Sequence, residues 1–168
     1  DSLTAYSASF SVNFIISALF ITGGIGFAVL IDIKTNKRWR KLTLNTKVVL
    51  LASLALNITA FLLIWLLEAN NVNTLASLST GEQALAAWFQ AVSPRTAGFN
   101  TLPIDQLTDA TTTLTILLMF IGGGSLSTAS GLKIGTFVVL IVATYTFLKR
   151  RKNASLMKRT IPQAQVMK

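Results

Sequence analysis

Apolar residues dominate the chain in long runs that short polar segments interrupt. The first run covers residues 10–33, and its core "FIISALFITGGIGFAVLIDI" has about the 20 residues that a membrane-spanning helix requires. The second covers residues 46–67 and reads "TKVVLLASLALNITAFLLIWLL". The pattern predicts one transmembrane helix in each run, with a polar segment containing Glu68 after the second.

A shorter apolar segment, "GEQALAAWFQAV", follows at residues 81–92. Ser79 and Glu82 have the spacing of a capping box, which predicts the start of a helix. Pro94 disfavours helical geometry at the residue before it, which predicts the end. About 12 residues cannot span a bilayer. The segment is therefore either a surface amphipathic helix or a helix that enters the membrane and returns.

The last apolar run, residues 110–148, is too long for one straight span. As a single helix it would measure about 58 Å, whereas the hydrocarbon core is about 30 Å thick. Glycine and serine are poor helix formers, so "GGGSLSTASG" at residues 122–131 predicts a break. Lys133, a charge inside an apolar run, is a candidate functional residue. Close helix packing by small residues is the alternative explanation of this segment.

Two of the apolar runs resemble each other. "LFITGG" ends at Gly24 and "MFIGGG" ends at Gly124, with four identical residues at an offset of 100. Each stretch precedes a basic cluster. This suggests an internal repeat of about 100 residues, a common arrangement in transporters.

Composition places the chain in a membrane and argues against an enzyme. Charged residues make up 12%, against about 25% in soluble domains, and mean hydropathy is +0.60. Without cysteine or histidine there are no thiol nucleophiles, imidazole bases or usual zinc ligands, and the six acidic residues are scattered. We therefore expect neither catalysis nor a bound cofactor.

The net charge of +9 has a topological explanation. Thirteen of the fifteen basic residues form two clusters after apolar runs, as in cytoplasmic loops, which argues against nucleic-acid binding. The clusters are Lys34, Lys37, Arg38, Arg40, Lys41 and Lys47, and Lys149, Arg150, Arg151, Lys152, Lys158, Arg159 and Lys168. Residues 68–80 and 101–109 are then expected outside.

The turn "SPRTAGFNT", residues 93–101, has the chemistry of an ion path. Irregular backbone at membrane depth is tolerated only where it lines protein or water. Backbone carbonyls can replace the hydration shell of a cation, and Gly98 can adopt the backbone angles this requires. Thr96 adds a hydroxyl, and the negative C-terminal end of the short helix favours a cation. An ordinary external turn is the alternative.

"SPRTAGFNT" followed by "LLMFIGGGSLSTASGLK" resembles the Trk/Ktr/HKT family of potassium transporters, most of all its bacterial membrane subunits of the KtrB and TrkH type. The upstream "FITGGIGFAVLIDI", basic loop and "LTLNTKVVL" resemble the same family. The resemblance implies an all-α integral membrane protein. Its helix–pore loop–helix repeats surround a pseudo-fourfold pore, and a Gly-rich intramembrane loop breaks the last helix.

On this resemblance the chain is a fragment of three parts. Residues 1–44 form the end of repeat two, residues 45–150 form repeat three, and residues 151–168 link to repeat four. Within repeat three the resemblance implies a helix at 46–67, a pore helix at 81–92, a filter at 94–100 and a broken helix at 110–148.

The resemblance also implies the site residues. The filter comprises Thr96, Ala97, Gly98, Phe99 and Asn100, with potassium held by the backbone carbonyls of the first three. The gate comprises Gly122, Gly123, Gly124, Ser125, Ser127, Thr128, Ser130, Gly131 and Lys133. Ser130 replaces a glycine of the family pattern, and Leu126 is bulkier than the residue common there.

The implied partners are a lipid bilayer, the remaining repeats, a second copy in a homodimer and a cytosolic nucleotide-binding regulatory subunit. The implied location is the bacterial inner membrane, with several spans. A non-conducting assembly or receptor subunit and a sodium-selective or sodium-coupled transporter remain as alternatives.

Overall fold

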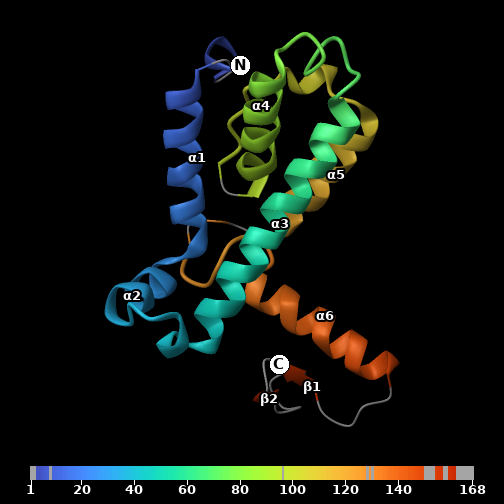
Figure 1. The fold of residues 1–168 in the computed structure, drawn as a ribbon. Helices are drawn as coiled ribbons and strands as arrows, with labels where there is room; N and C mark the ends of the chain where they lie inside the picture. The colour runs from blue at the N-terminus through green and yellow to red at the C-terminus, as the bar shows by residue number, and fades with distance from the viewer. Residues whose placement is uncertain are drawn as a thin grey trace.

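The computed structural model describes residues 3–7, 9–95, 97–127, 129 and 131–149, together with the backbone of 154–156 and 159–161. The helices and strands, apart from short 3₁₀ turns, are α1 (Phe10–Ile25), α2 (Phe27–Thr35), α3 (Leu44–Glu68), α4 (Thr80–Val92), α5 (Asp109–Phe120), α6 (Ile134–Leu148), β1 (Ala154–Leu156) and β2 (Arg159–Ile161). The fold is helical apart from one antiparallel hairpin, β1–β2, within the segment expected as a link. Figure 1 shows α4 between α1 and α3, with the segment joining α5 to α6 passing beneath it.

The first apolar run is not the single helix that the sequence predicts. It breaks at Gly26 into α1 and α2, which are bent by 91°. Gly26 has φ +95° and ψ 145°, a backbone conformation that glycine adopts without steric cost. An uninterrupted apolar pattern gives no sign of such a break.

In the part of the chain that the structure describes, one helix, α3, is long and apolar enough to cross a membrane, and the bent pair α1–α2 would make a second. These assignments rest on length and composition. The two shorter apolar helices, α5 and α6, flank non-helical residues 121–133, where the sequence predicts a break.

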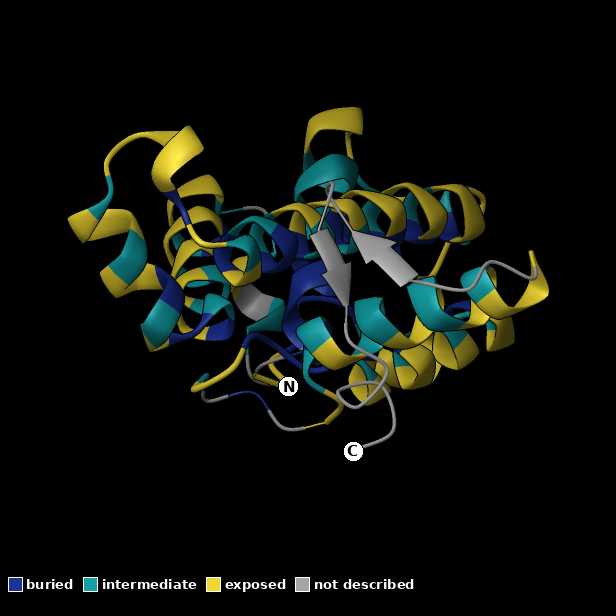
Figure 2. Cartoon of the chain, turned by 90° about the horizontal axis from the view of Figure 1, so that it is seen from below, coloured by how far each residue is buried: buried dark blue, intermediate teal, exposed yellow. Residues whose placement is uncertain are grey.

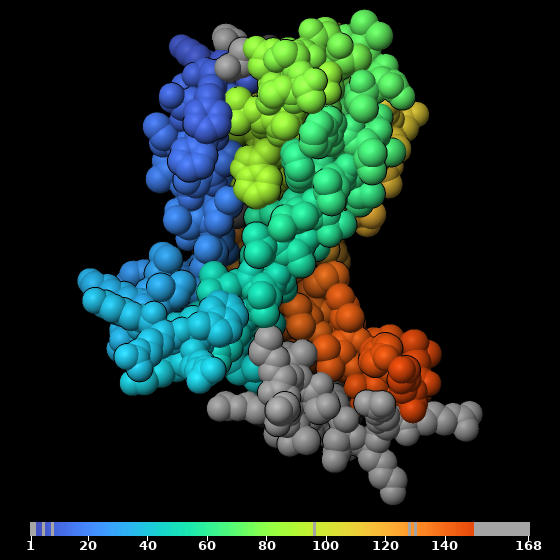
Figure 3. Space-filling model, viewed as in Figure 1, coloured from blue at the N-terminus to red at the C-terminus, as the bar shows by residue number. Residues whose placement is uncertain are grey.

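The main core lies where α3, α4 and α5 meet. Alanines on α4 bring its backbone close to α3, as small residues do between membrane helices. The buried apolar residues of this core are Ala60, Ile64, Leu75, Ala86, Ala87, Ala91, Leu102 and Leu118. Seen from below, buried residues occupy the centre and exposed residues the outer faces of the helices (Figure 2). In space-filling view α4 fills the gap between α1 and α3, so the three helices form one packed body (Figure 3).

Two carboxylates each bind the start of a later helix. Asp32 accepts hydrogen bonds from the amide (2.9 Å) and hydroxyl (2.8 Å) of Thr43, the N-cap of α3. Glu68 accepts hydrogen bonds from the amide (2.9 Å) and hydroxyl (2.8 Å) of Thr108, the N-cap of α5. It also accepts one from the hydroxyl of Thr74 at 2.6 Å. Glu68 is fully buried, so it is a structural anchor of the helix ends that is shielded from solvent.

Candidate functional site

The short helix α4 points its C-terminal end at the turn that follows it. The amide and hydroxyl of Ser79 donate to the carboxylate of Glu82 at 3.0 and 2.7 Å, which fixes the start of the helix and lowers the pKa of Glu82. The helix continues as a 3₁₀ turn, Ser93–Arg95, in which Ser93 and Arg95 are buried. The helix is thus held at both ends, and its partial negative charge lies beside residues 97–100.

The turn after α4 is shaped by Ser93. Its carbonyl accepts the amides of Ala97 (3.0 Å) and Gly98 (3.1 Å), and its hydroxyl donates to the carbonyl of Phe99. Gly98 has φ +71°, the left-handed conformation that glycine adopts most easily. Asn100 is buried and its side-chain amide donates to the carbonyl of Leu102 at 2.9 Å. These contacts make residues 97–100 a fixed turn.

This turn leaves oxygen atoms available. Within the described residues, the carbonyls of Ala97 and Gly98 accept no hydrogen bond, and both residues are exposed. The ring of Phe99 stacks on Phe20 of α1, with centroids 5.7 Å apart, which supports the turn from behind. Thr96, the remaining polar residue predicted here, lies outside the described residues. Backbone carbonyls on a fixed turn are the kind of oxygen donor that ion pathways use to bind cations.

The second predicted site is the loop at residues 121–133, which we call the Gly-rich loop. Three backbone hydrogen bonds close its neck: Gly122 N to Leu132 O (2.9 Å), Leu132 N to Phe120 O (3.1 Å) and Ile134 N to Gly123 O (3.0 Å). These three bonds bring the end of α5 and the start of α6 together at the neck of the loop.

The Gly-rich loop is bound to the kink between α1 and α2. The amide of Gly124 donates to the carbonyl of Gly24 at 2.8 Å, and the amide of Phe27 donates to Leu126 O at 3.2 Å. A Cβ atom at Gly124 would overlap the carbonyl of Ile25. The two stretches that resemble each other in sequence are therefore in direct backbone contact, at a distance that only glycine permits.

Other predicted loop residues have distinct environments. The Lys133 ammonium donates to the carbonyl of Ala129 at 2.7 Å, so it holds the loop from within. Ser125 is exposed, whereas Ser127 has a buried hydroxyl without a partner among the described residues. Gly131 has φ +85°, and its Cβ would crowd the carbonyl of Phe120. Thr128 and Ser130 lie outside the described residues.

Arg95 connects the two sites, and the sequence reasoning did not single it out. Its side chain is only 7% exposed. Nη1 donates to Oδ1 of Asn57 on α3 at 2.6 Å, and Nη2 donates to the carbonyl of Gly122 at 3.3 Å. Its position in the sequence could have indicated a special role, since Arg95 and Lys133 are the two basic residues outside the charged clusters.

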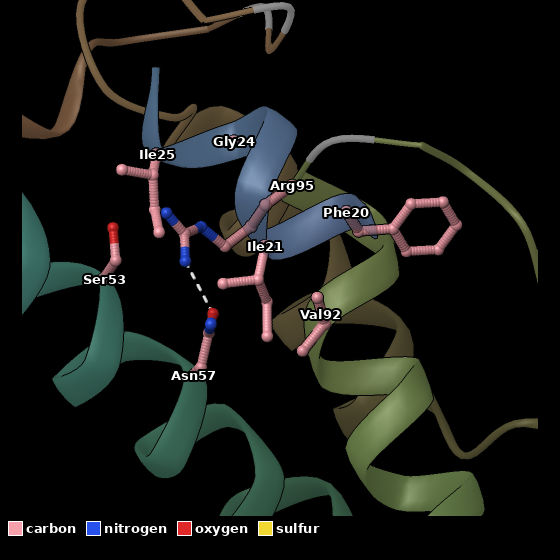
Figure 4. Close-up of a pocket in the computed structure, with 8 residues that line it drawn as sticks. All are labelled: Phe20, Ile21, Gly24, Ile25, Ser53, Asn57, Val92 and Arg95. Carbon is pink, nitrogen blue, oxygen red and sulfur yellow. Dashed lines mark hydrogen bonds between the residues drawn. The ribbon is translucent and has the colours of Figure 1, made fainter. Parts of the chain in front are cut away.

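A small cavity adjoins Arg95 (Figure 4). Its volume is about 20 Å³, which is enough for a single water molecule. It is lined by Phe20, Ile21, Gly24, Ile25, Ser53, Asn57, Val92 and Arg95. The Nε atom of Arg95 is buried without a partner among the described residues.

The described residues contain no group of three or more histidines, cysteines or acids that could hold a metal ion.

Comparisons with known proteins agree on one family. The sequence profile of TrkH, described as a cation transport protein, matches residues 1–168. The Ktr system potassium uptake protein B of Bacillus subtilis (strain 168) is 43% identical over 168 residues, which cover 100% of this chain and 38% of that protein. Its namesake in Vibrio alginolyticus is 43% identical over 172 residues, covering 100% of this chain and 37% of that protein. The potassium/sodium uptake protein NtpJ of Enterococcus hirae is 38% identical over 168 residues, covering 100% of this chain and 37% of that protein.

A crystal structure has the same fold. The potassium transporter TrkH from Vibrio parahaemolyticus superposes with a TM-score of 0.76 at 22% identity, over 99% of this chain and 36% of that one. The chain thus spans a little over a third of the length of the relatives that it matches.

Proposed function

Because this chain belongs to the TrkH family of cation transport proteins, we propose that it forms part of the wall of a potassium pathway across a membrane. The family consists of membrane-embedded cation transporters and not of enzymes. The ion, the complete pathway and the partners concern a longer protein than this chain, and they are parts of the proposal.

The observation that carries the proposal is the pair of carbonyls at Ala97 and Gly98, which accept no hydrogen bond within the described residues. They lie on a turn that Ser93 fixes at the C-terminal end of α4. We assign the carbonyls of Thr96, Ala97 and Gly98 to potassium, with Phe99 and Asn100 completing the turn. The remaining repeats would supply the other oxygens that a dehydrated ion needs.

The ion itself is inferred from relatives. Two relatives at 43% identity are named potassium uptake proteins, which favours potassium. The relative at 38% identity is named a potassium/sodium uptake protein, so sodium is the second candidate. A non-conducting subunit would have no use for two available carbonyls on a supported turn.

We assign a gating role to the Gly-rich loop, through its glycines 122, 123, 124 and 131, its hydroxyl residues 125, 127, 128 and 130, and Lys133. It follows α5 beneath the turn, and its neck is hydrogen-bonded to Arg95. Opening would require a partner that binds the displaced loop more tightly than the resting loop. A cytosolic nucleotide-binding subunit docking at the basic clusters would fill this role.

The proposal also includes the molecules that surround this chain in the membrane. The outer faces of α1, α3 and α5 expose large apolar side chains such as Phe14, Leu62 and Phe120. Lipid and the remaining repeats would cover them, and a second copy would complete a homodimer. We place the protein in the bacterial inner membrane with several spans.

The test uses a Ktr chimera, in which this chain replaces the matching segment of the Bacillus subtilis relative. Gly98→Ser should lower the potassium-to-sodium permeability ratio at least about fivefold, because a left-handed conformation costs a non-glycine residue about 1–2 kcal/mol. Reversal potentials in mixed salts measure this ratio.

Gly81→Ser is the matched control. Gly81 and Gly98 both have open space at the Cβ position, but only Gly98 has a positive φ. An unchanged ratio in Gly98→Ser, with normal current, would remove this turn from the ion pathway.

A further inference from the structure

Arg95 is a buried cation held by neutral oxygens. Among the described residues, its acceptors are the side-chain amide of Asn57 on α3 and the backbone carbonyl of Gly122 in the neck of the Gly-rich loop. Burying a charged side chain is costly, and hydrogen bonds to a charged group recover part of that cost. The position of Arg95 thus depends on two separate elements being in place.

We propose that Arg95 is a positioning residue that couples the turn at residues 97–100 to the Gly-rich loop, an inference that rests on the ion pathway proposed above. The backbone of Arg95 leads directly into the turn, while its Nη2 holds the loop at Gly122. Displacing the neck of the loop removes one of its two anchors. The turn and the loop are then linked through one side chain.

The guanidinium suits this role because it is a planar fork. Nη1 and Nη2 reach acceptors on different elements at the same time, at 2.6 and 3.3 Å. A lysine has the same charge but a single point of contact, so it cannot reproduce the two-sided geometry. Figure 4 shows the guanidinium facing Asn57 and Ser53 of α3, with Gly24 and Ile25 of α1 alongside.

Thermodynamic linkage predicts whether potassium favours the bound or the released loop. If ions in the turn favour the geometry that holds Arg95, they also favour the bound loop, and the effect is reciprocal. Potassium should therefore slow the release of the loop. Coupling between two sites is typically about fivefold or more in affinity.

The experiment uses a cysteine-free Ktr chimera with Ser127→Cys as the reporter, since the Ser127 hydroxyl is buried while the loop is bound and becomes accessible when the loop is released. The rate of modification by a soluble thiol reagent is measured with potassium and with a large organic cation in its place. In the parent, potassium should slow modification at least about fivefold. In Arg95→Gln, Arg95→Lys and Asn57→Ala, this potassium dependence should largely disappear.

Arg40→Gln is the control, because it removes an exposed arginine of the first basic cluster. Full potassium dependence in Arg95→Lys would show that the coupling needs the positive charge and not the two hydrogen bonds of the guanidinium, and would overturn the proposal. So would full dependence in Asn57→Ala, which keeps the test decisive if the Arg95 variants do not fold. A parent that carries no potassium flux would contradict the proposed function instead, so the two failures are distinguishable.

Discussion

Because Gly124 has no side chain, its backbone can lie in direct contact with the backbone of Gly24 and Ile25. Its amide binds Gly24 O at 2.8 Å, and a Cβ would overlap the carbonyl of Ile25 and lie 3.1 Å from Val49 Cγ1. Val49 is completely buried and the Ile25 carbonyl is backbone, so neither can move without wider change. A single methyl group is therefore enough to separate the loop from the kink.

We predict that Gly124→Ala displaces the Gly-rich loop and destabilises the protein by about 1–3 kcal/mol, the usual cost of overpacking. Thiol modification of the Ser127→Cys reporter should become faster, and potassium flux in the absence of the regulatory subunit should rise. Gly135→Ala is the control, since its Cβ would meet only Asn45 Oδ1 at an ordinary 3.7 Å. Equal behaviour of the two variants would argue against the contact.

At the scale of elements, the sequence is informative where a residue type has a local consequence. Pro94, Gly98 and the capping box at Ser79 predict where α4 begins and ends and where the turn follows, because each acts on its own backbone. The run of glycine and serine likewise predicts the interruption between α5 and α6.

The features that the sequence does not predict depend on partners distant in the chain. The bend at Gly26 is matched to the Gly-rich loop, about 100 residues later, and the apolar pattern around it is unbroken. Glu68 is buried where Thr108, 40 residues later in the chain, donates two of its hydrogen bonds. Arg95 is defined by Asn57 and Gly122 in the same way.

The neck of the Gly-rich loop should be separable from its tip. We predict that replacing residues 125–130 by two glycines raises potassium flux in the chimera when the regulatory subunit is absent. The three neck hydrogen bonds involve residues 120, 122, 123, 132 and 134, so the replacement leaves them in place. Rubidium uptake into vesicles measures the flux. If uptake falls or stays constant while the protein remains folded in the membrane, the tip serves packing alone.

At the scale of the whole molecule, the charged clusters and the apolar faces define an orientation. α3 is long and apolar enough for a full span, with Lys47 in the first basic cluster near one end and Glu68 at the other. The positive-inside rule then places residues 34–47 in the cytoplasm and residues 68–80 outside. The expected position of residues 149–168 is also cytoplasmic, and most of that segment lies outside the described residues.

We predict that an impermeant thiol reagent added outside intact cells modifies Val72→Cys and not Lys37→Cys. Both positions are exposed, and the chain has no cysteine of its own. Permeabilising the cells should make Lys37→Cys reactive as well, which shows that the site is accessible. Equal modification of both variants in intact cells would contradict the orientation.

The contact between Gly24 and Gly124 also sets an order of events during synthesis. The kink leaves the ribosome about 5–20 s before the loop, at about 5–20 residues per second. Until then the carbonyl of Gly24 and the amide of Phe27 lack the partners that the finished fold gives them. Unpaired groups in hydrocarbon cost several kcal/mol each, whereas a continuous helix would satisfy both. We therefore expect residues 10–35 to insert as one straight span and to bend only when the loop arrives. A nascent chain stopped before Gly124 should thus keep its ends farther apart, by spectroscopic distance measurement, than one stopped after α6.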